Sequence, residues 1–187
     1  MLTLAISESL LEKGDKRVVV SIDTTQAIEE VAKKGGAEVF RAKVGEANVV
    51  GQMKEKRAQL GGEGSSGGLI DGSFNYCRDS LLAALLIVRA IKREGRGFYH
   101  SVPSYHQDRA AMQIGRRKAE VAIRKMARTY EGDPTDGLKI VLPDRSWVLL
   151  RPSGTEDVVR VSAEATTAAK AGQIVKNFSK KLRELSR

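Results

Sequence analysis

Apolar and polar positions along the first 95 residues follow two patterns in turn. Short apolar runs bounded by turn residues are typical of buried strands, and apolar residues three or four positions apart are typical of helices. The patterns predict, in order, a helix over 2–12, a strand over 17–22, a helix after the caps at 23–25, a strand over 37–41, a helix over 47–57, short strands at 59–60 and 74–75, and a helix over 78–93. This alternation predicts a layered α/β domain with mainly parallel strand pairing.

The first helix is expected to bury four aliphatic side chains, and it should end near Gly14. These side chains are Leu4, Ile6, Leu10 and Leu11. The helix after residues 23–25 has apolar residues on one face and two lysines in its last turn, where cations favour the helix dipole.

The second half of the chain has a different order of elements. It predicts a basic helix over 113–129, strands over 138–142, 146–151 and 158–165, and a last helix that follows Thr166 and Thr167. Residues 143–145 are short enough to join the first two strands as a hairpin. Along 158–165, valine and alanine at 159, 161, 163 and 165 should be buried, with Arg160, Ser162 and Glu164 on the other face. These features predict an α+β domain with an antiparallel sheet backed by helices.

Glycine and proline interrupt the pattern between the two halves. Gly95, Gly97 and Pro103 lie in a stretch with few apolar residues, which is typical of a linker between domains. We therefore predict an α/β domain over 1–95, a hinge over 96–104 and an α+β domain over 105–187.

The composition is that of a globular chain. Its 187 residues are 41% apolar and 29% charged, which argues against disorder. A single cysteine, Cys77, excludes an internal disulfide and fits a reducing compartment. The longest apolar run, residues 81–88, is far shorter than the ~20 residues that span a bilayer. We expect a cytoplasmic protein with no membrane partner.

Positive charge is concentrated in one segment. Residues 92–130 hold ten Lys or Arg against three acids, a net +7 of the chain's +9. Clustered basic charge is compatible with nucleic-acid binding, but it also describes a solvated helix face that attracts an anionic ligand. Aromatic residues are only 5% of the chain, and no zinc-finger, helix-turn-helix or RNP-like motif accompanies the charge. These features disfavour nucleic acid as a partner.

The strand over 146–151 leads into a loop suited to an anion. Arg151 offers a planar fork of donors, Ser153 and Thr155 add hydroxyls, and Gly154 lets backbone N–H groups approach a ligand. Such groups together can bind a phosphate. Because Pro, Ser and Gly are also common turn residues, an ordinary turn is the alternative.

Residues 61–68 (Gly-Gly-Glu-Gly-Ser-Ser-Gly-Gly) form a second candidate loop. An ionised Glu63 only accepts hydrogen bonds, so it suits the hydroxyls of a polyol, and Ser65 and Ser66 can donate or accept. The alternative is a flexible Gly/Ser linker. A hydroxyl binder and a phosphate binder in one chain suggest a phosphosugar ligand.

At these loops the chain resembles the α-D-phosphohexomutases, which include phosphoglucomutases, phosphomannomutases and phosphoglucosamine mutases. Residues 151–156 (Arg-Pro-Ser-Gly-Thr-Glu) resemble the family's phosphate loop, and residues 61–63 with the Ser/Gly run resemble its sugar loop. As in archaeal-type members, the sugar loop is preceded by residues 43–49 (Lys-Val-Gly-Glu-Ala-Asn-Val), and the phosphate loop is preceded by residues 136–140 (Asp-Gly-Leu-Lys-Ile). The resemblance covers about residues 1–182 and only the third and fourth of the family's four domains.

The resemblance implies an isomerase that interconverts hexose 1-phosphate and hexose 6-phosphate. It implies Mg²⁺ and hexose 1,6-bisphosphate as cofactors of the whole enzyme, and it assigns the sugar contacts to Glu63 with Ser65 or Ser66. It assigns the binding of the non-reacting phosphate to four residues of the second loop: Arg151, Ser153, Gly154 and Thr155. Whether the sugar is glucose, mannose or glucosamine stays open.

Three positions depart from the family pattern, and two motifs are absent. The sugar loop has one extra residue, Gly68 stands where many members have His, and Asp157 replaces the usual Pro. The family's phosphoserine loop and triple-aspartate magnesium loop do not occur in the sequence. His100 and His106 have no neighbours at metal-ligand spacing.

We therefore expect no catalytic or metal-binding residues in this chain, no activity of the chain alone, and a partner N-terminal half in the same gene or another chain. A stand-alone phosphosugar-binding module is the first alternative, followed by a basic nucleic-acid-binding protein.

Overall fold

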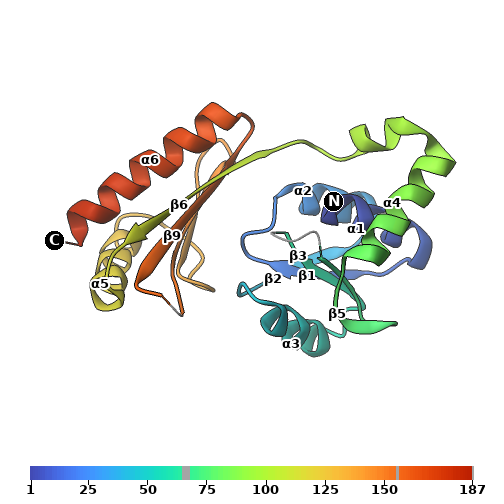
Figure 1. Ribbon diagram of the computed structural model, residues 1–187, viewed down its shortest axis with the longest axis horizontal. Coiled ribbons are helices and arrows are strands. Elements are labelled where there is room, and N and C mark those ends of the chain that lie inside the picture. The colour runs from blue at the N-terminus through green and yellow to red at the C-terminus, as the bar shows by residue number, and fades with distance from the viewer. Residues whose placement is uncertain (65–67, 155, 187) are drawn as a thin grey trace. The chain divides into compact units, whose positions relative to one another are not determined.

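The computed structural model describes residues 1–64, 68–154 and 156–186 (Figure 1). The chain divides into two compact units, Met1–Ser104 and Tyr105–Arg187. Each unit has its own hydrophobic core.

The first unit is built around a mixed sheet. Its elements are α1 (Leu2–Lys13), β1 (Arg17–Ser21), α2 (Ala27–Lys34), β2 (Glu38–Ala42), α3 (Glu46–Lys56), β3 (Leu60–Glu63), β4 (Gly68–Asp71), β5 (Asn75–Asp79), α4 (Ser80–Glu94) and the 3-10 helix η1 (Arg96–Ser101). The strand order is β2-β1-β3-β4-β5.

The prediction of mainly parallel pairing is wrong for the second half of this sheet. Strand β1 pairs in parallel with β2 and β3, but β3–β4 and β4–β5 are antiparallel. The reason is the length of the connection. Only residues 64–67 join β3 to β4, whereas a parallel connection needs a crossover of a dozen or more residues. The sequence pattern had also missed β4, whose residues follow a glycine-rich run.

Helices cover both faces of this sheet, with α1, α2 and α4 on one face and α3 on the other (Figure 1). Alternate residues of β1 supply the two cores, because successive strand side chains point to opposite faces. Val18 and Val20 join the core under α1, α2 and α4, and Val19 joins the core under α3. The α/β layering predicted from the sequence is thus confirmed.

One predicted core position in α1 is wrong. Leu2, Ile6 and Leu10 are buried at spacings of four residues, but Leu11 is 64% exposed. A residue next to Leu10 lies about 100° further round the helix, so it leaves the buried stripe. Leu4 is half-buried at the edge of the same core.

The predicted hinge contains ordered secondary structure at its start. Phe98 in η1 is buried, the Ser101 hydroxyl donates to the Phe98 carbonyl at 2.7 Å, and Lys34 Nζ donates to the Ser101 carbonyl at 3.2 Å. These contacts tie residues 96–101 to the first unit. A mobile joint over 96–104 stays a prediction. Because of the contacts of residues 96–101, we expect the mobile part to lie within 102–104.

The second unit is an antiparallel sheet with helices on one face. Its elements are β6 (His106–Gln113), α5 (Arg116–Ala127), β7 (Leu138–Val141), β8 (Trp147–Pro152), β9 (Val158–Ala165) and α6 (Ala168–Leu185), and the strand order is β6-β9-β8-β7. The α+β architecture and the β7–β8 hairpin are confirmed. The sequence pattern missed β6, and the predicted basic helix begins later, at Arg116. Strand β6 lies at the sheet edge and is mostly exposed, so its residues carry little apolar periodicity.

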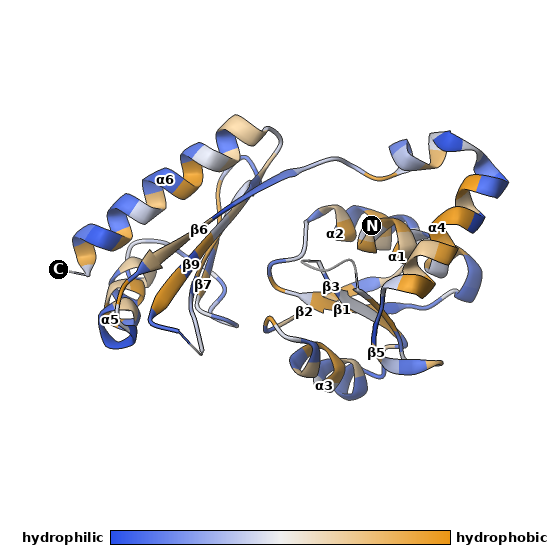
Figure 2. Cartoon of the chain, in the orientation of Figure 1, coloured by the Kyte–Doolittle hydropathy of each residue, from blue (hydrophilic) through white to orange (hydrophobic). Residues whose placement is uncertain are grey.

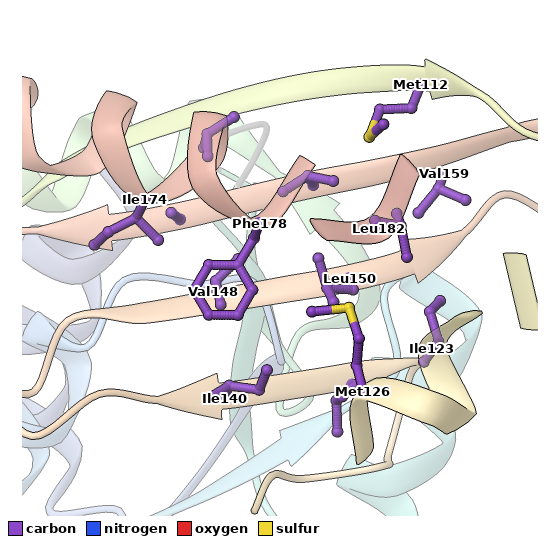
Figure 3. Close-up of a cluster of buried hydrophobic side chains, with 14 of the residues drawn as sticks. Met112, Ile123, Met126, Ile140, Val148, Leu150, Val159, Ile174, Phe178 and Leu182 are labelled. Carbon is purple, nitrogen blue, oxygen red and sulfur yellow. The ribbon is translucent and has the colours of Figure 1, made fainter. Parts of the chain in front are cut away.

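The core of this unit joins α5 and α6 to the sheet (Figure 3). Hydrophobic and hydrophilic residues alternate along α6 (Figure 2), and Ile174, Phe178 and Leu182 are buried as predicted. On β9 the four predicted apolar positions are also buried. On the opposite face of β9, which was expected to be polar, Glu164 is fully buried. Its carboxylate accepts hydrogen bonds from Trp147 Nε1 at 3.0 Å and from Gln107 Nε2 at 2.9 Å.

In the part of the chain that the structure describes, no helix combines the length and apolar character needed to cross a membrane.

Candidate functional site

The predicted sugar loop of the first unit includes the carboxyl end of β3, at the edge of the sheet where the parallel strands β1 and β2 also end. The carboxyl ends of parallel strands form one edge of a sheet, and α/β domains commonly bind ligands there. Thr24 follows β1, Gly45 follows β2, and Glu63 ends β3. Two hydrogen bonds join these ends: Gly64 N donates to Thr24 Oγ1 at 3.1 Å, and Gly45 N donates to Glu63 Oε1 at 2.6 Å. Sequence motifs that are far apart in the chain therefore meet at this edge.

The first two glycines of the predicted loop belong to β3, where they pair with β1 and β4, and helices approach the strand closely there. A β-carbon at Gly61 would lie 2.5 Å from Met53 Sδ in α3. At Gly62 it would lie 2.5 Å from Leu2 Cδ1 in α1. Since real side chains do not pack this closely, only glycine lets α1 and α3 cover both faces of the strand. The glycine pair lies directly before Glu63, the last residue of β3.

Glu63 is held by contacts within the unit. The residue is only 4% exposed, and its carboxylate contacts Gly45 N at 2.6 Å through Oε1 and Arg78 Nη1 at 3.0 Å through Oε2. Gly45 is the N-cap of α3 and has φ +120°, a backbone conformation that favours glycine. The carboxylate therefore also lies at the positive end of that helix dipole.

Arg78 is a site residue that the sequence reasoning missed. It lies in β5 and contacts both Glu63 and Glu46, the first residue of α3. Its only signal in the sequence was a cation shortly after the sugar loop, which is too weak to single it out. Lys43, directly after β2, is exposed at the same sheet edge.

Ser65 and Ser66 lie outside the described residues, so the choice between them as the sugar-binding serine stays a prediction.

The predicted phosphate loop of the second unit lies between β8 and β9. Ser153 N donates to the Val158 carbonyl at 2.8 Å, and Ser153 Oγ accepts from Glu156 N at 3.3 Å. Open space surrounds Gly154, since a β-carbon there would meet no atom within 4 Å. Thr155 lies outside the described residues. The predicted loop is thus closed at its base by Ser153 and open around Gly154.

Arg151 lies at the end of β8, directly before this loop. Its side chain is 19% exposed, and its Nε lies 3.8 Å from Asp136 Oδ2. Gly137, the residue after Asp136, has φ +95°, and a β-carbon at Gly137 would lie 3.0 Å from Arg151 Cα. The Asp136-Gly137 pair therefore packs against the backbone of β8 at Leu150 and Arg151, and it places a carboxylate near Arg151.

Arg160 is a second cation that the sequence reasoning did not assign to the site. It is the direct cross-strand partner of Arg151 in the β8–β9 pair, so both side chains leave the same face of the sheet. Arg160 is half exposed and pairs with Glu156 at 3.2 Å. The alternation along 158–165 had already placed it on the polar face, which was the available signal. Two guanidinium groups flank the loop and make it suitable for an anion.

A magnesium ion needs several oxygen ligands close together. Across residues 1–64, 68–154 and 156–186, no group of three or more His, Cys, Asp or Glu side chains is arranged to hold a metal. The described residues therefore do not fit a magnesium site.

Two family models match the chain and cover nearly all of it. Residues 1–106 match phosphoglucomutase/phosphomannomutase, alpha/beta/alpha domain III, and residues 108–181 match the phosphoglucomutase/phosphomannomutase C-terminal domain. The chain therefore belongs to the phosphoglucomutase/phosphomannomutase family and comprises its third and C-terminal domains.

Individual relatives agree with this assignment. The chain is 35% identical over 182 residues to a phosphoglucomutase/phosphomannomutase of Thermococcus kodakarensis, covering 94% of this chain and 40% of that protein. It is 32% identical over 186 residues to a probable phosphoglucosamine mutase of Methanopyrus kandleri, covering 95% and 41%. A family protein from Burkholderia thailandensis shares the fold, with a TM-score of 0.78 and 24% identity over 98% of this chain and 41% of that one. The chain thus spans about two-fifths of the length of these relatives.

Proposed function

We propose that this chain is the substrate-orienting C-terminal part of a phosphohexomutase, an isomerase that interconverts hexose 1-phosphate and hexose 6-phosphate. The observation that carries the proposal is the loop after β8. Arg151 and Arg160 lie opposite each other on one face, with the open Gly154 beside them. Paired guanidinium groups and a sterically open backbone suit a dianionic phosphate.

In this proposal the second unit binds the phosphate that does not react. Arg151 supplies charge and a planar fork, Ser153 and Thr155 supply hydroxyls, and the Gly154 amide is open to approach. The weak ion pair of Arg151 with Asp136, at 3.8 Å, supports this role because it orients the guanidinium without a close contact. A phosphate can therefore bind without breaking a short salt bridge.

The first unit binds hydroxyls of the sugar. Glu63 accepts hydrogen bonds, together with Ser65 or Ser66. A carboxylate has about four acceptor sites, and the contacts of Glu63 with Gly45 N and Arg78 Nη1 use two of them. A hexose phosphate carries both kinds of group, the hydroxyls that suit the loop of the first unit and the phosphate that suits the loop of the second.

The contribution of this chain to catalysis is positioning. Orienting a substrate lowers the barrier only when the reacting groups are also present. Those groups, by family resemblance the phosphoserine and magnesium loops, do not occur in this sequence. We propose that an N-terminal half, in the same or another polypeptide, supplies them together with Mg²⁺ and hexose 1,6-bisphosphate as cofactors.

Calorimetry and a coupled assay together test this function. The chain is titrated with glucose 6-phosphate, mannose 6-phosphate and glucosamine 6-phosphate, with the free sugars as controls. It is then assayed with the matching sugar phosphates, magnesium and hexose 1,6-bisphosphate. We expect at least one sugar phosphate to bind more tightly than its free sugar, without turnover. Absence of binding to all three would overturn the orienting role, and turnover by the isolated chain would overturn the positioning-only role.

A further inference from the structure

The side chain of Arg78 lies across Gly68. Gly68 begins β4 and is the direct partner of Glu63 in the β3–β4 pair. A β-carbon at Gly68 would lie 2.7 Å from Arg78 Cβ and 2.8 Å from its Cγ and Cδ. Such distances are too short for real carbon contacts. Arg78 therefore occupies the space that a side chain at position 68 would need.

From this position, the Arg78 guanidinium bridges two carboxylates. Its Nη1 lies 3.0 Å from Glu63 Oε2, and its Nε donates to Glu46 Oε2 at 2.6 Å. The backbone N–H of Arg78 also donates to Glu46 Oε2, at 3.2 Å. Hydrogen bonds from Arg78 lower the pKa of Glu46. The same Glu46 contact is the main cause that raises the pKa of Arg78.

These contacts form a closed ring. Gly45 N donates to one oxygen of Glu63, Arg78 contacts the other, and Glu46, the residue next to Gly45, holds Arg78. A carboxylate fixed at both oxygens has one orientation, whereas a carboxylate fixed at one oxygen can rotate. A planar guanidinium suits this bridge because its donors are rigidly arranged, unlike the point charge of lysine.

We propose that Arg78 is a positioning residue for Glu63, and that Gly68 is required for it to act. The inference rests on the proposed role of Glu63 as the acceptor for sugar hydroxyls. Arg78 acts through Glu63 by fixing its carboxylate, which sets the direction of the remaining acceptor sites. A side chain at position 68 and this placement of Arg78 exclude each other.

A double-mutant cycle tests whether Arg78 acts through Glu63. Wild type, Arg78→Ala, Arg78→Lys, Glu63→Gln and Arg78→Ala/Glu63→Gln are titrated with the three hexose 6-phosphates and with inorganic phosphate. We expect Arg78→Ala to weaken hexose phosphate binding about tenfold in the wild type and to have little effect in the Glu63→Gln background. Inorganic phosphate should bind equally to all five proteins, and Arg78→Lys should recover only part of the affinity. Equal effects of Arg78→Ala in both backgrounds would overturn the proposal.

Backbone amide exchange tests the ring without any sugar. In Arg78→Ala and in Gly68→Ala, the Gly45 amide should exchange faster than in the wild type, because the acceptor oxygen of Glu63 is no longer fixed. Removing the exposed Arg96 is the matched control, and melting curves show whether each variant is folded. Unchanged Gly45 exchange in folded Arg78→Ala would overturn the proposal. If no hexose phosphate binds the wild type, the proposed function fails, and the exchange result still decides whether Arg78 positions Glu63.

Discussion

The two units hold their key side chains in opposite ways. In the first unit Glu63 is 4% exposed and is held at both carboxylate oxygens by neighbouring groups. In the second, the Arg151 side chain is 19% exposed, and its ion pair with Asp136 is long, at 3.8 Å. A neutral hydroxyl offers weak hydrogen bonds, so its acceptor benefits from being fixed beforehand, whereas a dianionic phosphate binds strongly enough to orient a looser cation. Under the proposed function, the more rigidly held side chain is therefore the one assigned to the weaker ligand interaction.

The largest expected effect is cleavage of the chain between the two units by a protease. Each unit has its own core, and the contacts of η1 protect residues 96–101. We expect limited proteolysis to cut first over 102–105 and to leave two folded fragments, measured by mass spectrometry and circular dichroism. Earlier cutting inside 17–57 or 138–165 would contradict the two-unit description.

Gly137→Ala should destabilise the second unit by about 3 kcal/mol. A left-handed backbone costs about 1–2 kcal/mol for a non-glycine residue, and overpacking adds about 1–3 kcal/mol. Gly14→Ala is the matched control in the first unit, because Gly14 also has positive φ but has nothing within 4 Å of its β-carbon position. That control should lose only about 1–2 kcal/mol. Denaturant unfolding measures both, and equal losses would show that the packing of Gly137 against the backbone of β8 is unimportant.

Arg151→Ala should weaken hexose 6-phosphate binding at least tenfold with little loss of stability. The lost charge-assisted hydrogen bonds are worth about 1.5–3 kcal/mol each, and about 1.4 kcal/mol corresponds to one decade. Arg151→Lys should recover only part of the affinity, because lysine lacks the planar fork. Arg124→Ala, at a side chain 76% exposed in the same unit, controls for the loss of one positive charge. Unchanged calorimetric affinity in Arg151→Ala would reduce the loop to an ordinary turn.

The smallest effects concern acid stability, where the units should again differ. A hydrogen bond from Lys170, helped by Ser146, lowers the pKa of Asp144 to about 2. Because the pKa of Asp144 is lower in the folded than in the unfolded chain, ionised Asp144 stabilises the fold at pH values above its unfolded-state pKa. This contribution is lost as the pH falls through about 2. Burial raises the pKa of Asp15, so its contribution has the opposite sign and is lost as the pH rises through the raised value.

Asp144→Asn should therefore destabilise the second unit at pH 7, and Asp15→Asn should stabilise the first. Both differences should shrink when the unfolding curves are repeated at progressively lower pH. Shifts of the same sign at pH 7 would contradict the environments of these two carboxyl groups.

Periodic burial was readable from the sequence because it depends on residues close together in the chain. The stripe of Ile174, Phe178 and Leu182 predicted α6, and alternation predicted β9. The two fold classes and the two candidate loops followed from the same local signals and from the motifs.

Tertiary structure alone decided the features that depend on distant residues. The antiparallel half of the first sheet, the polar edge strand β6 and the cross-strand Arg160 all result from pairing between separated segments. Gly61 and Gly62 are strand residues because they pair with β1 and β4, and α1 and α3 leave no room there for a side chain. At Gly68 the side chain of Arg78 fills the space that a side chain would need. The sequence specifies which residues are small or charged, but only the packed chain shows which of them share the same space.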